Sequence, residues 1–230
     1  MLAAVATLLV FGARNLGRTI ARRFVEDGWD AVAVARSEET LASLPEGIRG
    51  IRADATSADD VERVFADAGD VDLVVDAITS TPSFGGALHE APPEALEPYV
   101  HGLLPGVFNV LRVGGRVLAA KGSGTLVQIT GGSARRGNPG RGPWAAAAFA
   151  TRALVQSEAA ELRELGVHVA LLIVDGTIES PKTAGWLGDD PDASVSEDDV
   201  ARAVAYLAAQ SPRAWTHELQ LTPRLDRWVP

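Results

Sequence analysis

The chain has 230 residues and a mass of 24.1 kDa, 47% of its residues are hydrophobic, and it contains no cysteine. Disulfides, thiolate metal sites and a cysteine nucleophile are therefore excluded. A formal net charge of −9 argues against a nucleic-acid-binding protein, which typically carries a basic surface. The apolar start of the sequence lacks a basic flank and is too short to span a bilayer, so we expect a cytoplasmic protein without membrane association.

Seven short apolar segments recur along the chain, and we expect them to be β-strands. They cover residues 5–11, 31–35, 48–53, 71–77, 124–130, 167–174 and 217–221. Helix-like segments separate them, and this alternation indicates a mostly parallel sheet with helices on both faces. We predict a single α/β domain over residues 1–230. The polar segment 185–199 is expected to be a solvated surface loop, and segment 79–96 a flexible loop able to cover a substrate.

The first strand is followed by a turn typical of dinucleotide-binding sites. Gly12 and Gly17 have the outer spacing of the G-x-G-x-x-G pattern, and Arg14 replaces the middle glycine. Such a turn presents backbone amides at a helix N-terminus to a pyrophosphate. We expect Asn15 and Leu16 to contact the cofactor as well. The alternative interpretation is a tight turn that binds no ligand.

The end of the second strand favours NADP(H) over NAD(H). Arg36 and Ser37 stand where NAD-specific sites usually carry an acid for the ribose 2′-hydroxyl. Arg14 could approach the same 2′-phosphate from the glycine turn, although each arginine alone could be a solvated surface residue. Asp54, which follows the third strand with Ala55, could accept a hydrogen bond from the adenine amino group.

These features together resemble the short-chain dehydrogenase/reductase family over about residues 5–221. The resemblance rests on the glycine turn, "ARS" after the second strand, "DAT" after the third, "VVDA" at the end of the fourth and "AAELRELGVHV" before the sixth. It implies a Rossmann-type, doubly wound, seven-stranded parallel sheet of order 3-2-1-4-5-6-7. It also implies that NADP(H) meets Ala77, Gly176 and Thr177, with Ile78 in place of a glycine under the nicotinamide. No metal is expected.

The resemblance also implies that the family's catalytic residues are replaced. Its members carry a Tyr-x-x-x-Lys pair on the helix after the fifth strand and a serine just after that strand. Counting back from "AAELRELGVHV" places Trp144 at the tyrosine position, Ala148 at the lysine position and Gly131 near the serine position. An indole N–H donates a hydrogen bond but does not titrate usefully, and alanine carries no charge. Losing positioned acid–base catalysis costs about 10²–10⁴ in rate.

Other polar residues could contribute to the site. His101 falls near the position of a family asparagine and titrates near neutral pH, but it could equally be a helix-surface or interface residue. Thr130 and Ser133 could donate to a substrate oxygen or cap a turn. Three arginines could meet an acidic substrate or belong to a solvated loop: Arg135, Arg136 and Arg141. Trp144 is expected to line the pocket.

Three functions are consistent with this sequence. The first is an NADP(H)-dependent oxidoreductase of carbonyl or hydroxyl substrates with slow or non-standard catalysis. The second is a non-redox enzyme on the same scaffold, such as a cyclase, dehydratase or isomerase. The third is a non-catalytic NADP(H)-binding partner protein. We also expect a homodimer or homotetramer, because the small residues 145–148 would let helices of two copies approach closely.

Overall fold

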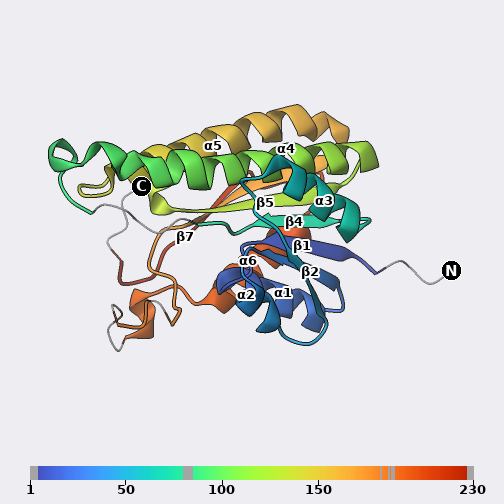
Figure 1. Ribbon diagram of the computed structural model, residues 1–230. Coiled ribbons are helices and arrows are strands. Elements are labelled where there is room, and N and C mark those ends of the chain that lie inside the picture. The colour runs from blue at the N-terminus through green and yellow to red at the C-terminus, as the bar shows by residue number, and fades with distance from the viewer. Residues whose placement is uncertain (1–4, 80–84, 182, 186, 188–189, 227–230) are drawn as a thin grey trace.

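A seven-stranded sheet lies between two layers of helices in the computed structural model, which describes residues 5–79, 85–181, 183–185, 187 and 190–226 (Figure 1). The strand order is β3-β2-β1-β4-β5-β6-β7, and every neighbouring pair is parallel. The predicted fold class and strand order are therefore confirmed. Because the strands are parallel, their carboxyl ends share one edge of the sheet, where the loops that carry the predicted site begin.

All seven strands begin and end within two residues of the expected segments. Their bounds are β1 Thr7–Phe11, β2 Asp30–Ala35, β3 Ile48–Arg52, β4 Leu73–Asp76, β5 Gly124–Gly131, β6 Val167–Val174 and β7 Glu218–Leu221. All of β6 is buried, as expected for a strand covered on both faces.

The helices divide between the two faces of the sheet (Figure 1). One face is covered by α1 Leu16–Glu26, the short α2 Glu38–Ala42 and α6 Glu197–Ala208; the other is covered by α3 Ala58–Ala68, α4 Leu104–Lys121 and α5 Gly142–Leu162. Each layer encloses its own apolar core. In α1, for example, Ile20, Ala21 and Phe24 are buried on the side that faces the sheet.

One stretch, Pro93–Lys121, is long and apolar enough by composition to cross a membrane, with a mean hydropathy of 1.3. It comprises the short helix η2 (Pro93–Leu96), the π-helical turn η3 (Pro98–Leu103) and α4. The hydropathy is that of an 18-residue window within the stretch, and 56% of this window is buried inside the protein. Packing of α4 on the sheet and on α5 accounts for its apolar composition.

The segment expected to be a flexible loop, residues 79–96, contains local structure. Residues 80–84 lie outside the described part of the chain. Beyond them, η1 (Leu88–Glu90) and η2 form two short helical turns. The Leu88 side chain rests on the start of α5, where a Cβ on Gly142 would lie 3.1 Å from its Cδ1. The described part of this segment is therefore packed against the helix that carries Trp144.

The prediction of a surface loop over residues 185–199 is wrong at its end. Residues 186, 188 and 189 lie outside the described chain, but a helical turn η6 (Pro191–Ala193) follows, and α6 begins at Glu197. Ser196 accepts a hydrogen bond of 3.0 Å from the backbone N–H of Asp199 and caps α6. The acids of the first turn complement the helix dipole. This acidic run is a helix start rather than a purely solvated loop.

Candidate cofactor and active site

Two glycines form the turn that joins β1 to α1. Gly12 has a φ of +89°, and a Cβ on it would lie 2.6 Å from the backbone oxygen of Ala77. A Cβ on Gly17 would lie 2.6 Å from the backbone oxygen of Gly12. Both contacts are too close for a side chain, and the positive φ disfavours any other residue at Gly12. The tight turn is as predicted, and backbone packing requires both glycines.

The first turn of α1 leaves its backbone amides open. Asn15 precedes the helix without a side-chain cap, and no acidic residue lies in the first turn. Serines cap α2, α3 and α6, whereas α4 and α5, like α1, have no side-chain cap. Open N–H groups at a helix N-terminus are suitable donors for a phosphate. Arg14 is exposed beside this turn and forms no ion pair with the described residues.

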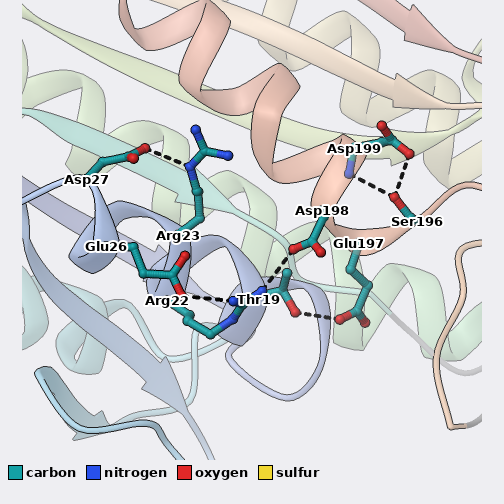
Figure 2. Close-up of polar contacts among 9 residues, drawn as sticks. All are labelled: Thr19, Arg22, Arg23, Glu26, Asp27, Ser196, Glu197, Asp198 and Asp199. Atoms are coloured by element: carbon teal, nitrogen blue, oxygen red, sulfur yellow. Dashed lines mark hydrogen bonds and ion pairs between the residues drawn. The ribbon is translucent and has the colours of Figure 1, made fainter.

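The N-terminus of α6 docks on the first turns of α1 (Figure 2). Thr19 Oγ1 donates a hydrogen bond of 2.5 Å to Glu197 Oε2. Arg22 Nη2 lies 2.9 Å from Asp198 Oδ1 and is also paired, through Nη1, with Glu26. These contacts join two segments that are far apart in the sequence. They hold α1, and therefore the glycine turn, against the sheet.

The carboxyl end of β2 carries the residues predicted to select the cofactor. The Arg36 side chain is 76% exposed, and its Nη1 lies 3.9 Å from Asp54 Oδ2. Ser37 Oγ accepts a hydrogen bond of 3.4 Å from the Thr40 N–H and caps α2. The exposed guanidinium and the hydroxyl hydrogen of Ser37 both remain available to an anion. Binding of a 2′-phosphate here stays a prediction.

The loop after β3 is fixed by a residue that sequence reasoning missed. Asp54 Oδ1 accepts hydrogen bonds from the Thr56 N–H, at 3.0 Å, and from its hydroxyl, at 2.9 Å. Asn109 is buried on α4, and its Nδ2 donates to the backbone oxygens of Ala55, at 3.0 Å, and Thr56, at 3.2 Å. Asn109 thereby positions the loop expected to contact adenine. A lone asparagine within the apolar sequence of α4 is the signal that could have identified it.

The predicted catalytic positions come together at the start of α5. A Cβ on Gly131 would lie 3.5 Å from Cζ2 and 3.7 Å from Nε1 of the Trp144 indole. Ala148 lies one turn further along α5 and is 1% exposed. The Tyr99 ring of η3 contacts Trp144, with centroids 5.9 Å apart, and its buried hydroxyl has no hydrogen-bond partner in the described part of the chain. The indole thus covers the end of β5, and its lining of a substrate pocket stays a prediction.

The three alternative donors lie in different surroundings. His101 is exposed on η3, between the buried Tyr99 and Leu103. Thr130 and Ser133 are buried, at 8% and 7% exposure, at the end of β5 and in the turn η4 (Gly132–Ala134). Neither hydroxyl is hydrogen-bonded within the described part of the chain, so turn capping does not account for them. A catalytic role for any of the three stays a prediction.

Two of the three arginines after β5 are committed to contacts within the protein. Arg136 forms two hydrogen bonds with the Asp175 carboxylate, of 2.8 and 3.0 Å, and this pairing raises the pKa of the guanidinium. Arg135 donates to Gln220 Oε1 at 3.0 Å, and Gln220 Nε2 donates to Asp175 Oδ2 at 2.9 Å. Arg141 is exposed immediately before α5. Of the three, Arg141 is the best placed to meet an acidic substrate.

The residues expected at the nicotinamide end lie on the loops after β4 and β6. The Ala77 backbone lies against the glycine turn, while Ile78 Cδ1 points towards Gly106 on α4, 3.6 Å from where its Cβ would be. Gly176 packs against Pro223, since a Cβ on it would lie 2.5 Å from the proline Cδ. Thr177 is exposed next to it. Ile78 therefore occupies space on the α4 side of its loop.

No group of three or more potential metal ligands occurs among the described residues. The remaining geometry, a glycine turn and an uncapped helix at the carboxyl edge of a 3-2-1-4-5-6-7 sheet, defines a Rossmann-type dinucleotide-binding fold. The sequence profile of the short chain dehydrogenase family matches residues 6–187, and the chain belongs to this family of oxidoreductases.

Relatives and solved structures of this family match over most of their length. A serine 3-dehydrogenase from Agrobacterium fabrum is 24% identical, over 94% of this chain and 93% of its own. A 3-oxoacyl-[acyl-carrier-protein] reductase from Staphylococcus aureus is 28% identical, over 89% of this chain and 91% of its own. A solved short chain dehydrogenase/reductase family protein is 27% identical, with a TM-score of 0.81 over 96% of this chain and 97% of its own. A closed serine dehydrogenase complexed with NADP⁺ has the same fold, with a TM-score of 0.84 at 18% identity over 97% of each chain.

Proposed function

We propose that this protein binds NADP(H) and acts on a small carbonyl or hydroxyl substrate without the usual tyrosine–lysine pair of its family. The observation that carries the proposal is the contact of Trp144 with Gly131, together with the burial of Ala148 one turn away. A complete family site would have a tyrosine phenol, a lysine ammonium and a serine hydroxyl at these three positions. This chain has the Trp144 indole, the Ala148 methyl group and the Gly131 backbone there instead. Catalysis is therefore slow or uses another donor.

The described residues fit an NADP(H) molecule at the carboxyl edge of the sheet. The open amides of α1 would bind the pyrophosphate, and Arg14, Arg36 and Ser37 would bind the 2′-phosphate. Asp54 would accept from the adenine amino group, and the loops at Ala77 and at residues 176–177 would surround the nicotinamide. When bound, the cofactor supplies or accepts a hydride. Several solved structures of this fold contain bound NADP, which supports the same choice here.

Proton transfer is the step for which this chain lacks the family's groups. The Trp144 N–H can donate a hydrogen bond to a substrate oxygen, but it cannot give up its proton and recover it. His101 is exposed, whereas Thr130 and Ser133 are buried at the strand end with free hydroxyls. We expect a hydroxyl or a solvent molecule to mediate proton transfer, with a rate about 10²–10⁴ below that of a complete site.

Calorimetry with NADPH and NADH, followed by turnover assays, tests this proposal. The assays follow NADPH absorbance with a panel of carbonyls that includes 3-oxoacyl thioesters, and NADP⁺ reduction with hydroxy amino acids, because these are the substrates of the relatives' activities. The proposal predicts tight NADPH binding and slow turnover. Loss of turnover in His101→Ala would identify that residue as the donor, and failure to bind either dinucleotide would refute the proposal.

The same assays separate the two other functions. Product formation without a change in NADPH absorbance would indicate a cyclase, dehydratase or isomerase on this scaffold. Tight NADPH binding with no product from any substrate would indicate a binding protein. A partner whose affinity follows the NADPH/NADP⁺ ratio would support that interpretation.

We also propose that two copies associate through the outer face of α4 and α5. An apolar groove runs between these helices and is lined by Val100, Leu104, Pro105, Phe108, Ala150, Ala153, Leu154 and Ser157. Phe108 and Phe149 are 49% and 43% exposed there. The reason offered from the sequence was wrong, because Ala145, Ala147 and Ala148 are buried inside the chain. Light scattering should give a dimer or larger species, and Phe108→Glu should dissociate it.

A further inference from the structure

Asp76 is a fully buried carboxyl group at the centre of the sheet. It is the last residue of β4 and has 0% exposure. In the parallel register its neighbours are Phe11 on β1 and Gln128 on β5, neither of which can ionise. The proposed function gives this acid no role, and a buried acid is costly unless it is paired. The burial of an acid next to the glycine turn therefore needs an explanation.

The hydrogen bonds around Asp76 leave two acceptors without a donor. Asp76 Oδ1 accepts from the Ile78 N–H at 2.9 Å, but Oδ2 has no partner among the described residues. Gln128 is 1% exposed, and its Nε2 donates to the backbone oxygens of Ile129, at 3.1 Å, and Asp76, at 3.4 Å. Gln128 Oε1 has no partner either. Each buried acceptor left unsatisfied costs about 1–3 kcal/mol.

A proton on Asp76 supplies the donor that this pair needs. A neutral carboxyl can accept from Ile78 with one oxygen and donate to Gln128 Oε1 with the other. Rotating the Gln128 amide would not help, because its oxygen would then face two backbone carbonyls. Burial raises the pKa of Asp76 to about 7, opposed by the Ile78 N–H and by Gln128. No charged side chain of the described residues contributes to this shift.

The same carboxyl group fixes the backbone segment that packs against the glycine turn. The bond from Ile78 N–H to Asp76 closes a turn over Ala77, whose own N–H donates to the Phe11 backbone oxygen at 2.9 Å. A Cβ on Gly12 would lie 2.6 Å from the Ala77 oxygen and 3.0 Å from the Ile78 nitrogen. Any shift of this turn therefore moves an atom that is in contact with the glycine turn.

We propose that Asp76 is a positioning residue that acts in its protonated form. The neutral carboxyl accepts a hydrogen bond from Ile78, donates one to Gln128 and so holds the Ala77 turn against Gly12. The position of this turn sets the affinity for NADP(H). The coupling to cofactor rests on the proposed function, whereas the protonated state does not. Ionisation leaves a buried carboxylate whose Oδ2 has no hydrogen-bond donor among the described residues. The Ala77 turn is then held less firmly, and the backbone that packs against the glycine turn of the proposed cofactor site is no longer fixed.

Infrared spectroscopy tests the protonated state without any cofactor. The wild-type protein should show the carbonyl band of a protonated carboxyl at pH 6, and the band should fade as the pH rises to 8.5. The band should be missing from Asp76→Asn and present in the control Asp30→Asn, which changes an exposed acid at the start of β2. A wild-type spectrum without this band at pH 6 would overturn the proposal.

Calorimetric titration with NADPH over the same pH range tests the positioning role. Asn at residue 76 can accept from Ile78 and donate to Gln128 at every pH, so Asp76→Asn should bind tightly throughout. Relative to this variant, the wild-type protein should lose about threefold or more in affinity between pH 6 and 8.5. Using Asp76→Asn as the reference removes the titration of the cofactor's own phosphate.

Asp76→Ala, which provides neither contact, should bind weakly at every pH. If NADPH binds and the ratio between wild type and Asp76→Asn does not change with pH, the positioning role is refuted while the proposed function stands. If neither protein binds NADPH, the proposed cofactor and the coupling both fail, and the infrared band still decides whether Asp76 holds a proton.

Discussion

The Trp144 indole lies over Gly131, so that a side chain at Gly131 would begin 3.5 Å from the ring. This is a contact between the first turn of α5 and the last residue of β5. A serine and a tyrosine at these positions would share the same space and could both reach one substrate oxygen. This contact is the basis of our proposal that the chain acts without the usual catalytic side chains of its family.

Restoring the family's residues should restore turnover. The variant Gly131→Ser/Trp144→Tyr/Ala148→Lys adds a hydroxyl, a phenol and an ammonium at positions that the structure brings together. We expect NADPH consumption with an active carbonyl to rise by about 10²-fold or more, in line with the contribution of positioned acid–base groups. The measurement is the initial rate at saturating NADPH, with circular dichroism to verify folding, because Ala148 is buried.

The control for this experiment is Ala160→Tyr, which adds a phenol to an exposed position near the other end of the same helix. It should leave the rate unchanged. A folded triple variant that binds NADPH but turns over no faster than the wild type would show that the missing side chains are not what limits catalysis.

Arg36 should decide the choice between NADPH and NADH. Its guanidinium is exposed at the end of β2 and only weakly paired with Asp54. Arg36→Ala should reduce NADPH affinity about 10- to 100-fold, because it removes charge-assisted hydrogen bonds to the 2′-phosphate, and should leave NADH affinity unchanged. Calorimetry with both cofactors measures this. The control is Arg49→Ala. Arg49 is an exposed residue of β3 whose guanidinium donates hydrogen bonds to the backbone oxygens of Asp67 and Ala68 at the end of α3.

The fold could be predicted from the sequence because its signals are local and repeated. Apolar runs such as residues 167–174 mark strands that are buried on both faces, and their alternation with helices specifies a parallel sheet. The acidic residues 197–199 were misjudged because a charged run on its own does not distinguish solvation from a helix start. The signal was the serine at residue 196, whose side chain caps the helix.

The site was less predictable because its contacts join distant segments. The glycine turn could be located from spacing alone, but the partner of Asp175 is Arg136, 39 residues earlier, and nothing local indicates that pairing. Asn109 and Gln128 likewise form hydrogen bonds with backbone oxygens that lie 54 and 52 residues earlier in the sequence. Asp76 was visible as the acid of "VVDA" at the end of the fourth strand, whereas its burial and its unpaired oxygen required the three-dimensional structure.

Asp76→Asn should stabilise the protein at alkaline pH. Burial raises the pKa of Asp76 from 3.8 to about 7, so the folded state holds a proton that the unfolded state releases. Stability from this group is therefore present below about pH 4, declines as the pH rises to about 7 and stays low above it. The substitution should remove this decline and gain about 4 kcal/mol at most at pH 8. Urea unfolding at pH 5 and pH 8 measures it, and a gain that is equal at both values would contradict the assignment.

His168 should produce the opposite dependence on pH. It is 1% exposed on β6, stacks on Trp215 with ring centroids 5.2 Å apart, and its Nε2 lies 2.9 Å from the Thr216 backbone oxygen. Burial lowers the pKa of this imidazole below 6.5, so the unfolded state takes up its proton first as the pH falls. Stability from this group is complete above about pH 6.5 and is lost below it.

The variant His168→Phe tests this dependence. It keeps the ring stack, removes one hydrogen bond at a cost of about 1 kcal/mol at pH 7, and abolishes the titration. Comparing urea midpoints of this variant and the wild type at pH 7 and pH 5 should show the gap between them narrowing at pH 5. An unchanged gap would contradict this, because it would mean that the imidazole takes up its proton over the same pH range in the folded and the unfolded state.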